Sequence, residues 1–211
     1  MQNVLADLAL ESEAAMALTL RVARAVDASS RSPHEAALAR IATAIGKYWI
    51  CKRAPALVNE AQECLGGAGY VEESIMPRLY RQAPLNSIWE GSGNIQCLDV
   101  LRALAKEPET RDALFGELLA AKGTHPDYDR ELGWLAKAFE DKVTLETRSR
   151  YVVERSALAL QASILQRAGN REVADTFCAS RLGGQHGLAF GTLHAEAPMK
   201  VLIERAAPSQ S

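Results

Sequence analysis

The sequence predicts an all-α protein built as an antiparallel helical bundle. The first observation is that apolar residues recur every three or four positions through most of the 211-residue chain. The second is a series of helix start and stop signals, made of capping residues, prolines and glycines. The third is that no run alternates apolar and polar residues and no hairpin turn is present, so nothing in the sequence predicts a strand. Helical faces of this length are buried by packing antiparallel neighbours together.

The first expected element is a long helix from Asn3 to about Asp27. Apolar or small side chains at helical spacing mark the face that we expect to be buried, namely Leu5, Leu8, Ser12, Ala15, Thr19, Val22 and Val26. The small side chains in the middle of this face predict a shallow seam where a second helix approaches closely.

A second helix is predicted to follow at once. Ser32 is its expected N-cap, Pro33 suits the first helical position, and Glu35 lies at the capping-box spacing from Ser32. Pro55 is expected to kink this helix, because its ring removes a backbone donor. Gly66 and Gly67 are expected to end it, since glycine adopts the left-handed conformation of a C-terminal cap without strain.

The rest of the chain continues the helical pattern. A loop with one short helix, around Met76–Arg81, is expected between Gly69 and Gly93, and a third main helix is expected from near Gly93 to before Pro108. Further helical segments are predicted in the second half: Ala113–Ala121, a region from Asp127 to Ala168 joined by charged turns, Asn170–Arg181 with Asn170 as N-cap, and a short helix near Pro198–Arg205.

Composition narrows the class of protein. Lys and Arg number 24 and Asp and Glu 26, so the formal charge of -2 gives no electrostatic reason to expect nucleic acid or an anionic membrane as the main partner.

No apolar run reaches the ~20 residues that span a bilayer, and the N-terminus lacks the pattern of a signal peptide. The four cysteines have no C-x-x-C spacing, which predicts reduced thiols in a cytoplasmic protein. The scattered histidines predict no metal site: His34, His125, His186 and His194.

Candidate chemistry is concentrated between Glu60 and Leu104. Glycines at helix ends can bring free backbone amides close to an anion such as a pyrophosphate, although on glycine content alone ordinary helix caps are the preferred explanation. Glu90 follows Ile88 and Trp89, and such an apolar setting would raise the pKa of its carboxyl and suit it to proton abstraction. The plain alternative is an exposed loop glutamate.

One continuous string of the chain is more specific, and it reads ECLGGAGYVEESIMPRLYRQAPLNSIWEGSGNIQCLDVLRAL. It resembles the C-terminal helical domain of the acyl-CoA dehydrogenase family, FAD-dependent oxidoreductases of fatty-acid metabolism that desaturate acyl-CoA thioesters between Cα and Cβ. The resemblance rests on three motifs: a helix ending in GG-x-GY, an arginine about a dozen residues later, and an aromatic–Glu–Gly–Ser turn that starts another helix. The string is most similar to the branch that contains the bacterial adaptive-response protein induced by DNA alkylation. The resemblance covers residues 1–105, and residues 106–211 are expected to form a helical extension packed on them.

The resemblance implies roles for individual residues. Glu90 stands at the position of the catalytic base, whose own backbone amide also binds the thioester carbonyl. Trp89 and Gly91 are implied at the substrate, Trp89 as a wall of the acyl pocket and Gly91 where the backbone approaches the thioester. The resemblance also implies two segments that contact FAD. The first contacts FAD held mainly by a neighbouring subunit and consists of Glu63, Cys64, Leu65, Gly66 and Gly67. The second follows the base and consists of Ser92, Gly93 and Asn94.

Two positions depart from the family's pattern. Many members have Gln where this chain has Glu63, so only the backbone role transfers there. Gln82 replaces the acid that often follows the family's arginine, so Arg81 is interpreted as structural.

The family's partners are also implied: an acyl-CoA substrate, FAD, an electron-transfer flavoprotein and other copies of the chain in a dimer or tetramer. The chain contains neither the N-terminal helical domain nor the β-barrel domain of the family, and it starts after the first helix of the C-terminal domain. We therefore expect a fragment that is colourless and inactive by itself, and whose exposed apolar faces, such as Leu38, Ile41 and Ile45, drive oligomerisation.

Two alternatives remain open at this point. One is a DNA-alkylation-response protein that binds DNA and keeps only a vestigial dehydrogenase site, for which Arg148, Arg150 and Arg155 would supply a basic stripe. The near-neutral charge argues against it, so DNA is a less favoured partner. The other is a non-catalytic helical oligomerisation module, against which the retention of Glu90 argues.

Overall fold

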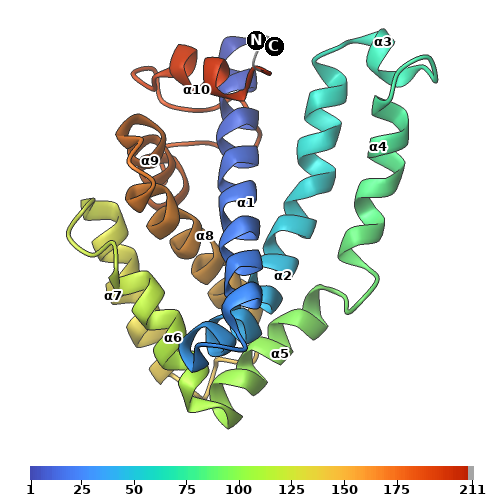
Figure 1. Ribbon diagram of the computed structural model, residues 1–211. Coiled ribbons are helices and arrows are strands. Elements are labelled where there is room, and N and C mark those ends of the chain that lie inside the picture. Colours follow the sequence, from blue (N-terminus) through green and yellow to red (C-terminus); the bar gives the residue numbers. More distant parts are fainter. Residues whose placement is uncertain (209–211) are drawn as a thin grey trace.

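The computed structural model describes residues 1–208, and every regular element in that range is helical (Figure 1). The first half contains α1 (Gln2–Ala28), α2 (Pro33–Glu63), α3 (Gly67–Tyr70), α4 (Met76–Gln82), the 3-10 helix η1 (Ala83–Ser87) and α5 (Gly93–Lys106). The second half contains α6 (Pro108–Leu119), α7 (Pro126–Glu140), α8 (Ser149–Arg167), α9 (Arg171–Phe177), the π-helical turn η2 (Cys178–Leu182) and α10 (Met199–Ala206). The prediction of an all-α fold is confirmed. No described helix is both long and apolar enough to cross a membrane.

The predicted helix ends agree with the structure in most places. The Glu35 N–H donates to Ser32 Oγ at 3.3 Å, although the Glu35 carboxylate pairs with Arg21 and leaves the reciprocal half of the capping box unformed. The Val173 N–H donates to Asn170 Oδ1 at 3.1 Å, which confirms the cap of α9. Helix α2 continues through Pro55. Gly66 after its end has a φ of 59° and a ψ of -143°, which only glycine adopts readily but which is not the left-handed cap conformation expected from the sequence, and Gly67 already starts α3.

The predicted buried face of α1 is wrong. Leu5, Ser12, Thr19 and Val26 are exposed, and the helix buries a neighbouring stripe instead: Ala6, Asp7, Leu10, Glu11, Ala14, Leu18 and Ala25. The reason is that this stripe contains two carboxylates whose partners lie far away in the sequence, on Arg181 and Arg53. A search for apolar spacing passes over such a face, because a carboxylate is buried only when a distant cation pairs with it.

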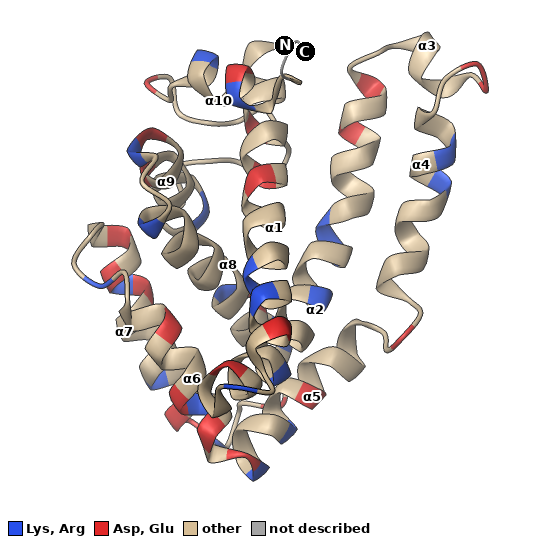
Figure 2. Ribbon diagram, viewed as in Figure 1, with Lys and Arg blue, Asp and Glu red and all other residues tan. Residues whose placement is uncertain are grey.

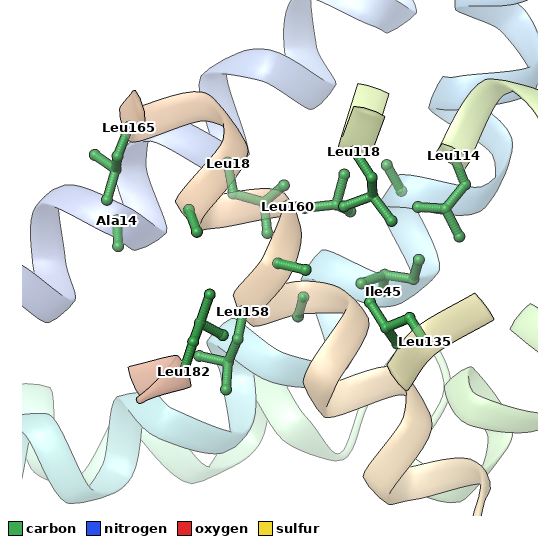
Figure 3. Close-up of a cluster of buried hydrophobic side chains, with 14 of the residues drawn as sticks. Ala14, Leu18, Ile45, Leu114, Leu118, Leu135, Leu158, Leu160, Leu165 and Leu182 are labelled. Atoms are coloured by element: carbon green, nitrogen blue, oxygen red, sulfur yellow. The ribbon is translucent and has the colours of Figure 1, made fainter. Parts of the chain in front are cut away.

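The hydrophobic core joins both halves of the chain. Figure 3 shows Leu18 of α1 and Ile45 of α2 beside leucines that α6, α7 and α8 contribute. Helix α8 is central, since it packs against α1, α2, α5, α6, α7 and α9. The expectation that Leu38, Ile41 and Ile45 are exposed is wrong: α1, α5, α6 and α8 all pack on α2, and these three side chains are at most 1% exposed.

The apolar surface that is exposed lies elsewhere. The C-terminal part of α2 and the hairpin formed by α3 and α4 project together away from α1 (Figure 1). We call residues 65–98, from this projection to the start of α5, the arm. Most of its large apolar side chains are at least 39% exposed: Leu65, Tyr70, Val71, Ile75, Leu79, Tyr80, Leu85, Ile88, Trp89, Ile95 and Leu98.

Candidate functional site

The turn that carries Glu90 connects η1 to α5. Glu90 is exposed and has a φ of 53°, the only positive φ of a non-glycine residue in the described chain, and Gly91 follows with a φ of 98°. Its apolar neighbours Ile88 and Trp89 are 63% and 55% exposed, so residues 1–208 do not enclose the carboxylate in the apolar setting that the sequence suggests. A left-handed glutamate is strained, and the turn therefore needs contacts that hold it in place.

Two side chains supply those contacts, and neither was identified from the sequence. Lys47 Nζ of α2 donates to the carbonyl oxygens of Trp89 at 2.7 Å and of Gly91 at 2.5 Å. Gln96 Nε2 of α5 donates to the carbonyl oxygens of Glu90 at 2.9 Å and of Gly91 at 3.3 Å. All three carbonyl oxygens of the turn thus accept hydrogen bonds from side chains of the flanking helices.

Gly91 is favoured by its positive φ, and both glycines of the turn leave room for side chains of the flanking helices. A Cβ on Gly91 would lie 2.5 Å from Gln96 Nε2, and one on Gly93 would lie 3.0 Å from Lys52 Cε and 3.4 Å from the Tyr48 ring. Gly91 therefore lets Gln96 reach the turn, and Gly93 lets the start of α5 approach α2.

The start of α5 holds the second predicted FAD segment. Ser92 is the N-cap residue without a side-chain cap bond, and the N–H groups of Gly93, Asn94 and Ile95 have no hydrogen-bond acceptor among residues 1–208. Arg150 of α8 reaches this point, since its Nη1 donates to Asn94 Oδ1 at 3.1 Å and its Nε to the Tyr48 hydroxyl at 3.3 Å. Sequence reasoning gave Arg150 no role here, because a contact over 56 positions leaves no local pattern.

The first predicted FAD segment lies at the far end of α2. Glu63, Leu65, Gly66 and Gly67 are exposed, and Cys64 is half-buried. Lys47 touches the Glu90 turn and is 16 positions before Glu63 on the same helix, which corresponds to ~24 Å at 1.5 Å per residue. Within a single chain, the two predicted FAD segments, Glu63–Gly67 and Ser92–Asn94, are therefore far apart.

The glycines of the first segment face open space. A Cβ on Gly66 or Gly67 would meet no atom within 4 Å, and Gly67 has an ordinary negative φ. Neither packing nor backbone conformation within residues 1–208 explains a glycine at position 67. A bound group or a second chain that approaches the backbone closely would explain it.

The other basic residues considered from the sequence, Arg81, Arg148 and Arg155, form ion pairs with acidic side chains. Arg81 forms a two-pronged ion pair with Glu72, in accord with its structural interpretation. Of the predicted basic stripe, Arg148 pairs with Asp141 and Arg155 with Glu131, and basic and acidic residues are interspersed over the helices (Figure 2). Among residues 1–208, no three His, Cys, Asp or Glu side chains gather as metal ligands. All four cysteines are free.

Comparisons with known proteins agree on one kind of domain. A family model described as "Acyl-CoA dehydrogenase, C-terminal domain" matches residues 1–105. The Escherichia coli protein AidB is 50% identical over 130 residues, which cover 62% of this chain and 24% of that protein. Acyl-CoA dehydrogenase family member 11 of Caenorhabditis elegans is 30% identical over 177 residues, which cover 82% of this chain and 28% of that protein. The crystal structure of Caenorhabditis elegans ACDH-11 in complex with C11-CoA superposes with a TM-score of 0.66 at 25% identity, over 81% of this chain and 33% of that one.

The matches with these two curated proteins thus span about a quarter of the relatives' own length. They also extend beyond residue 105, where the resemblance described from the sequence ends. The division of the chain at residue 105 stays a prediction.

Proposed function

From the family to which the chain belongs, that of the acyl-CoA dehydrogenase C-terminal domain matched by residues 1–105, we propose a function. The chain contributes the catalytic base of an FAD-dependent acyl-CoA dehydrogenase. The proposed reaction is the desaturation of an acyl-CoA thioester between Cα and Cβ, with Glu90 as base. The observation that carries the proposal is the turn itself, which presents a carboxylate and its own backbone N–H to solvent from a strained, braced conformation.

The chemistry requires both groups. An α-proton of a thioester is weakly acidic, so its removal needs a carboxylate at Cα and a hydrogen-bond donor at the carbonyl oxygen, where negative charge develops. The Glu90 carboxylate takes the proton. Among residues 1–208, the Glu90 N–H has no acceptor, so it is free to donate to the thioester carbonyl. Trp89 is exposed beside Glu90 and would form one wall of the acyl pocket, while Gly91 leaves the backbone accessible.

The residues present fit FAD, the cofactor of the family. The unpaired N–H groups at the start of α5 suit phosphate or hydroxyl oxygens, and the open space at Gly66 and Gly67 suits close approach to the backbone. Bound FAD supplies the acceptor for the β-hydrogen, which leaves as hydride. Because the two segments lie at opposite ends of the arm, we propose that Ser92, Gly93 and Asn94 contact the FAD of their own subunit and that Glu63–Gly67 contact FAD of a neighbouring one.

This arrangement requires more than one copy of the chain, and the exposed apolar arm is the surface that we propose to be covered in the dimer or tetramer. An electron-transfer flavoprotein is the proposed acceptor of the electrons, and the cytoplasm the proposed location. The 211-residue chain by itself is expected to be colourless and inactive, because it offers FAD only separate edges.

The test is Glu90→Gln in the full-length gene product that contains residues 1–211, loaded with FAD. The substitution keeps the shape of the side chain and removes the proton acceptor, so reduction of the flavin by acyl-CoA should slow by at least ~10²–10⁴-fold while FAD stays bound. The control is Glu140→Gln, an exposed glutamate at the end of α7 and outside the arm, which should leave the rate unchanged. Reduction of the Glu90→Gln protein at the parental rate would show that the base lies elsewhere, and a complete polypeptide that binds no FAD would contradict the proposal.

A further inference from the structure

We propose that Lys47 is a positioning residue of the active site, which holds the Glu90 turn so that its backbone N–H and carboxylate face the substrate. This inference rests on the proposed function and adds to it a residue of α2, 43 positions before the base. Lys47 does not touch the reacting atoms. It acts through the two carbonyl groups that it binds.

The direction of the Glu90 N–H follows from the geometry of one peptide unit. The Trp89 carbonyl and the Glu90 N–H belong to the same planar peptide, and in a trans peptide the two groups point in opposite directions. Since the Trp89 carbonyl points at Lys47 Nζ on α2, the Glu90 N–H points away from α2. Lys47 thereby sets the direction of the donor that we assign to the thioester carbonyl.

The same argument extends along the turn. Lys47 and Gln96 both donate to the Gly91 carbonyl, and Gln96 donates to the Glu90 carbonyl, so the N–H groups of Gly91 and Ser92 also point away from these side chains. Hydrogen bonds from an ammonium group are stronger than those from a neutral amide, so Lys47 is the stronger of the two restraints.

The surroundings of Lys47 exclude a role in an ordinary ion pair. Within residues 1–208, no Asp or Glu oxygen lies within 4.0 Å of its Nζ, although the side chain is half-buried between α2 and the turn. Backbone carbonyl groups are the acceptors that satisfy its charge. A half-buried ammonium group is costly unless it is hydrogen-bonded, so its position is fixed by the turn and the turn is fixed by it. The φ of 53° at Glu90 is the strain that this bracing maintains.

The first test measures the turn directly, in the 211-residue chain. Chymotrypsin cleaves after Trp89, which is exposed, and cleavage requires the turn to leave its braced conformation. Lys47→Met keeps the aliphatic stem and removes the donors, so the rate of cleavage after Trp89 should rise at least tenfold with little change in the melting temperature. Lys47→Arg keeps hydrogen-bond donors, so its rate of cleavage should stay near the parental rate. The matched control is Lys137→Met, which changes an exposed lysine of α7 and should also be cleaved at the parental rate. Equal cleavage of Lys47→Met and the parent would overturn the proposal.

A second variant covers the case in which Lys47→Met fails to fold. Gln96→Leu removes the other donor from the surface of α5, and it should also accelerate cleavage after Trp89, by a smaller factor. An unchanged rate in this variant would mean that the turn keeps its shape without side-chain donors, which overturns the proposal.

The second test measures the consequence in the complete FAD-loaded polypeptide. Misdirecting one donor to a developing oxyanion costs ~10²–10³ in the rate of the chemical step, so flavin reduction at saturating acyl-CoA should fall by that factor in Lys47→Met and recover in Lys47→Arg. A parental rate in Lys47→Met, together with an inactive Glu90→Gln protein, overturns the role of Lys47 alone. A parental rate in Glu90→Gln overturns the proposed function instead.

Discussion

Arg181, the most buried arginine of residues 1–208, ties the end of the second half to the start of the first. Its guanidinium pairs with Asp7 and with Glu11 of α1, and the three side chains are 6%, 2% and 5% exposed. Both carboxylates have one further donor, the Gly191 N–H for Asp7 at 2.9 Å and Arg53 for Glu11 at 3.1 Å. We predict that Arg181→Met destabilises the fold substantially, because it leaves two buried carboxylates without their shared cation.

The size of the effect follows from these contacts. Removing one partner of a buried ion pair costs about 3–5 kcal/mol, and the remaining donors place this case at the lower end, about 3 kcal/mol. One kcal/mol lowers the melting temperature of a chain of this size by roughly 2–4 °C, so the shift should be roughly 6–12 °C. The loss is a large share of the 5–15 kcal/mol that ordinarily holds a fold, which makes it easy to measure.

The assay is unfolding in urea and by heat at pH 7, followed by circular dichroism. The matched control is Arg205→Met, which removes an ion pair between α10 and Glu13 of α1 whose side chains are 40% and 23% exposed. Such a partly solvated pair contributes at most about 1 kcal/mol. If Arg181→Met costs no more than Arg205→Met, burial of Asp7 and Glu11 does not depend on Arg181, and the reasoning that explains the buried face of α1 is refuted.

Four further predictions concern separate features. Burial acts to raise the pKa of Glu117, but hydrogen bonds from Arg21 and Arg167 outweigh it and hold this pKa below the ordinary 4.5. The stability that the lowered pKa gives is present above pH 4.5 and is lost as the pH falls further. Glu117→Gln should therefore flatten the decline of the melting temperature between pH 5 and 3. Gly69→Ala should cost about 1–3 kcal/mol of stability in urea unfolding, because its Cβ would lie 2.1 Å from the Gln62 carbonyl oxygen, whereas Gly67→Ala, in open space, should stay within about 0.5 kcal/mol. Sedimentation should show a dimer or larger oligomer at micromolar concentration, and Ile75→Glu on the exposed arm should weaken it, while a monodisperse parental monomer would contradict this. Duplex DNA should bind only weakly at ~150 mM salt, since Arg148 and Arg155 are already paired, and submicromolar affinity lost on neutralising Arg148, Arg150 and Arg155 would favour the DNA-binding alternative.

The parts of the fold that sequence predicts are those set by neighbouring residues. Caps such as Ser32 and Asn170 act within three positions, so helix starts are predictable from a short window. The parts that it missed depend on distant partners. Asp7 is buried with Arg181, which reaches it over 174 positions, and Leu38 is buried where helices from both halves of the chain pack on α2. A pattern of apolar spacing contains neither fact.

The same distinction applies to the candidate site. The identities of Glu90 and its glycines follow a local motif, but what holds the turn does not: Lys47 comes from α2, Gln96 from α5, and Arg150 joins both helices at Tyr48 and Asn94. Arg150 belongs to α8, whose packing on α2 and α5 is part of the common core. The second half of the chain therefore fixes the relative position of the two helices that brace the base. A family model ending at residue 105 includes the chemical groups of the turn, whereas the support that sets their direction extends to residue 150.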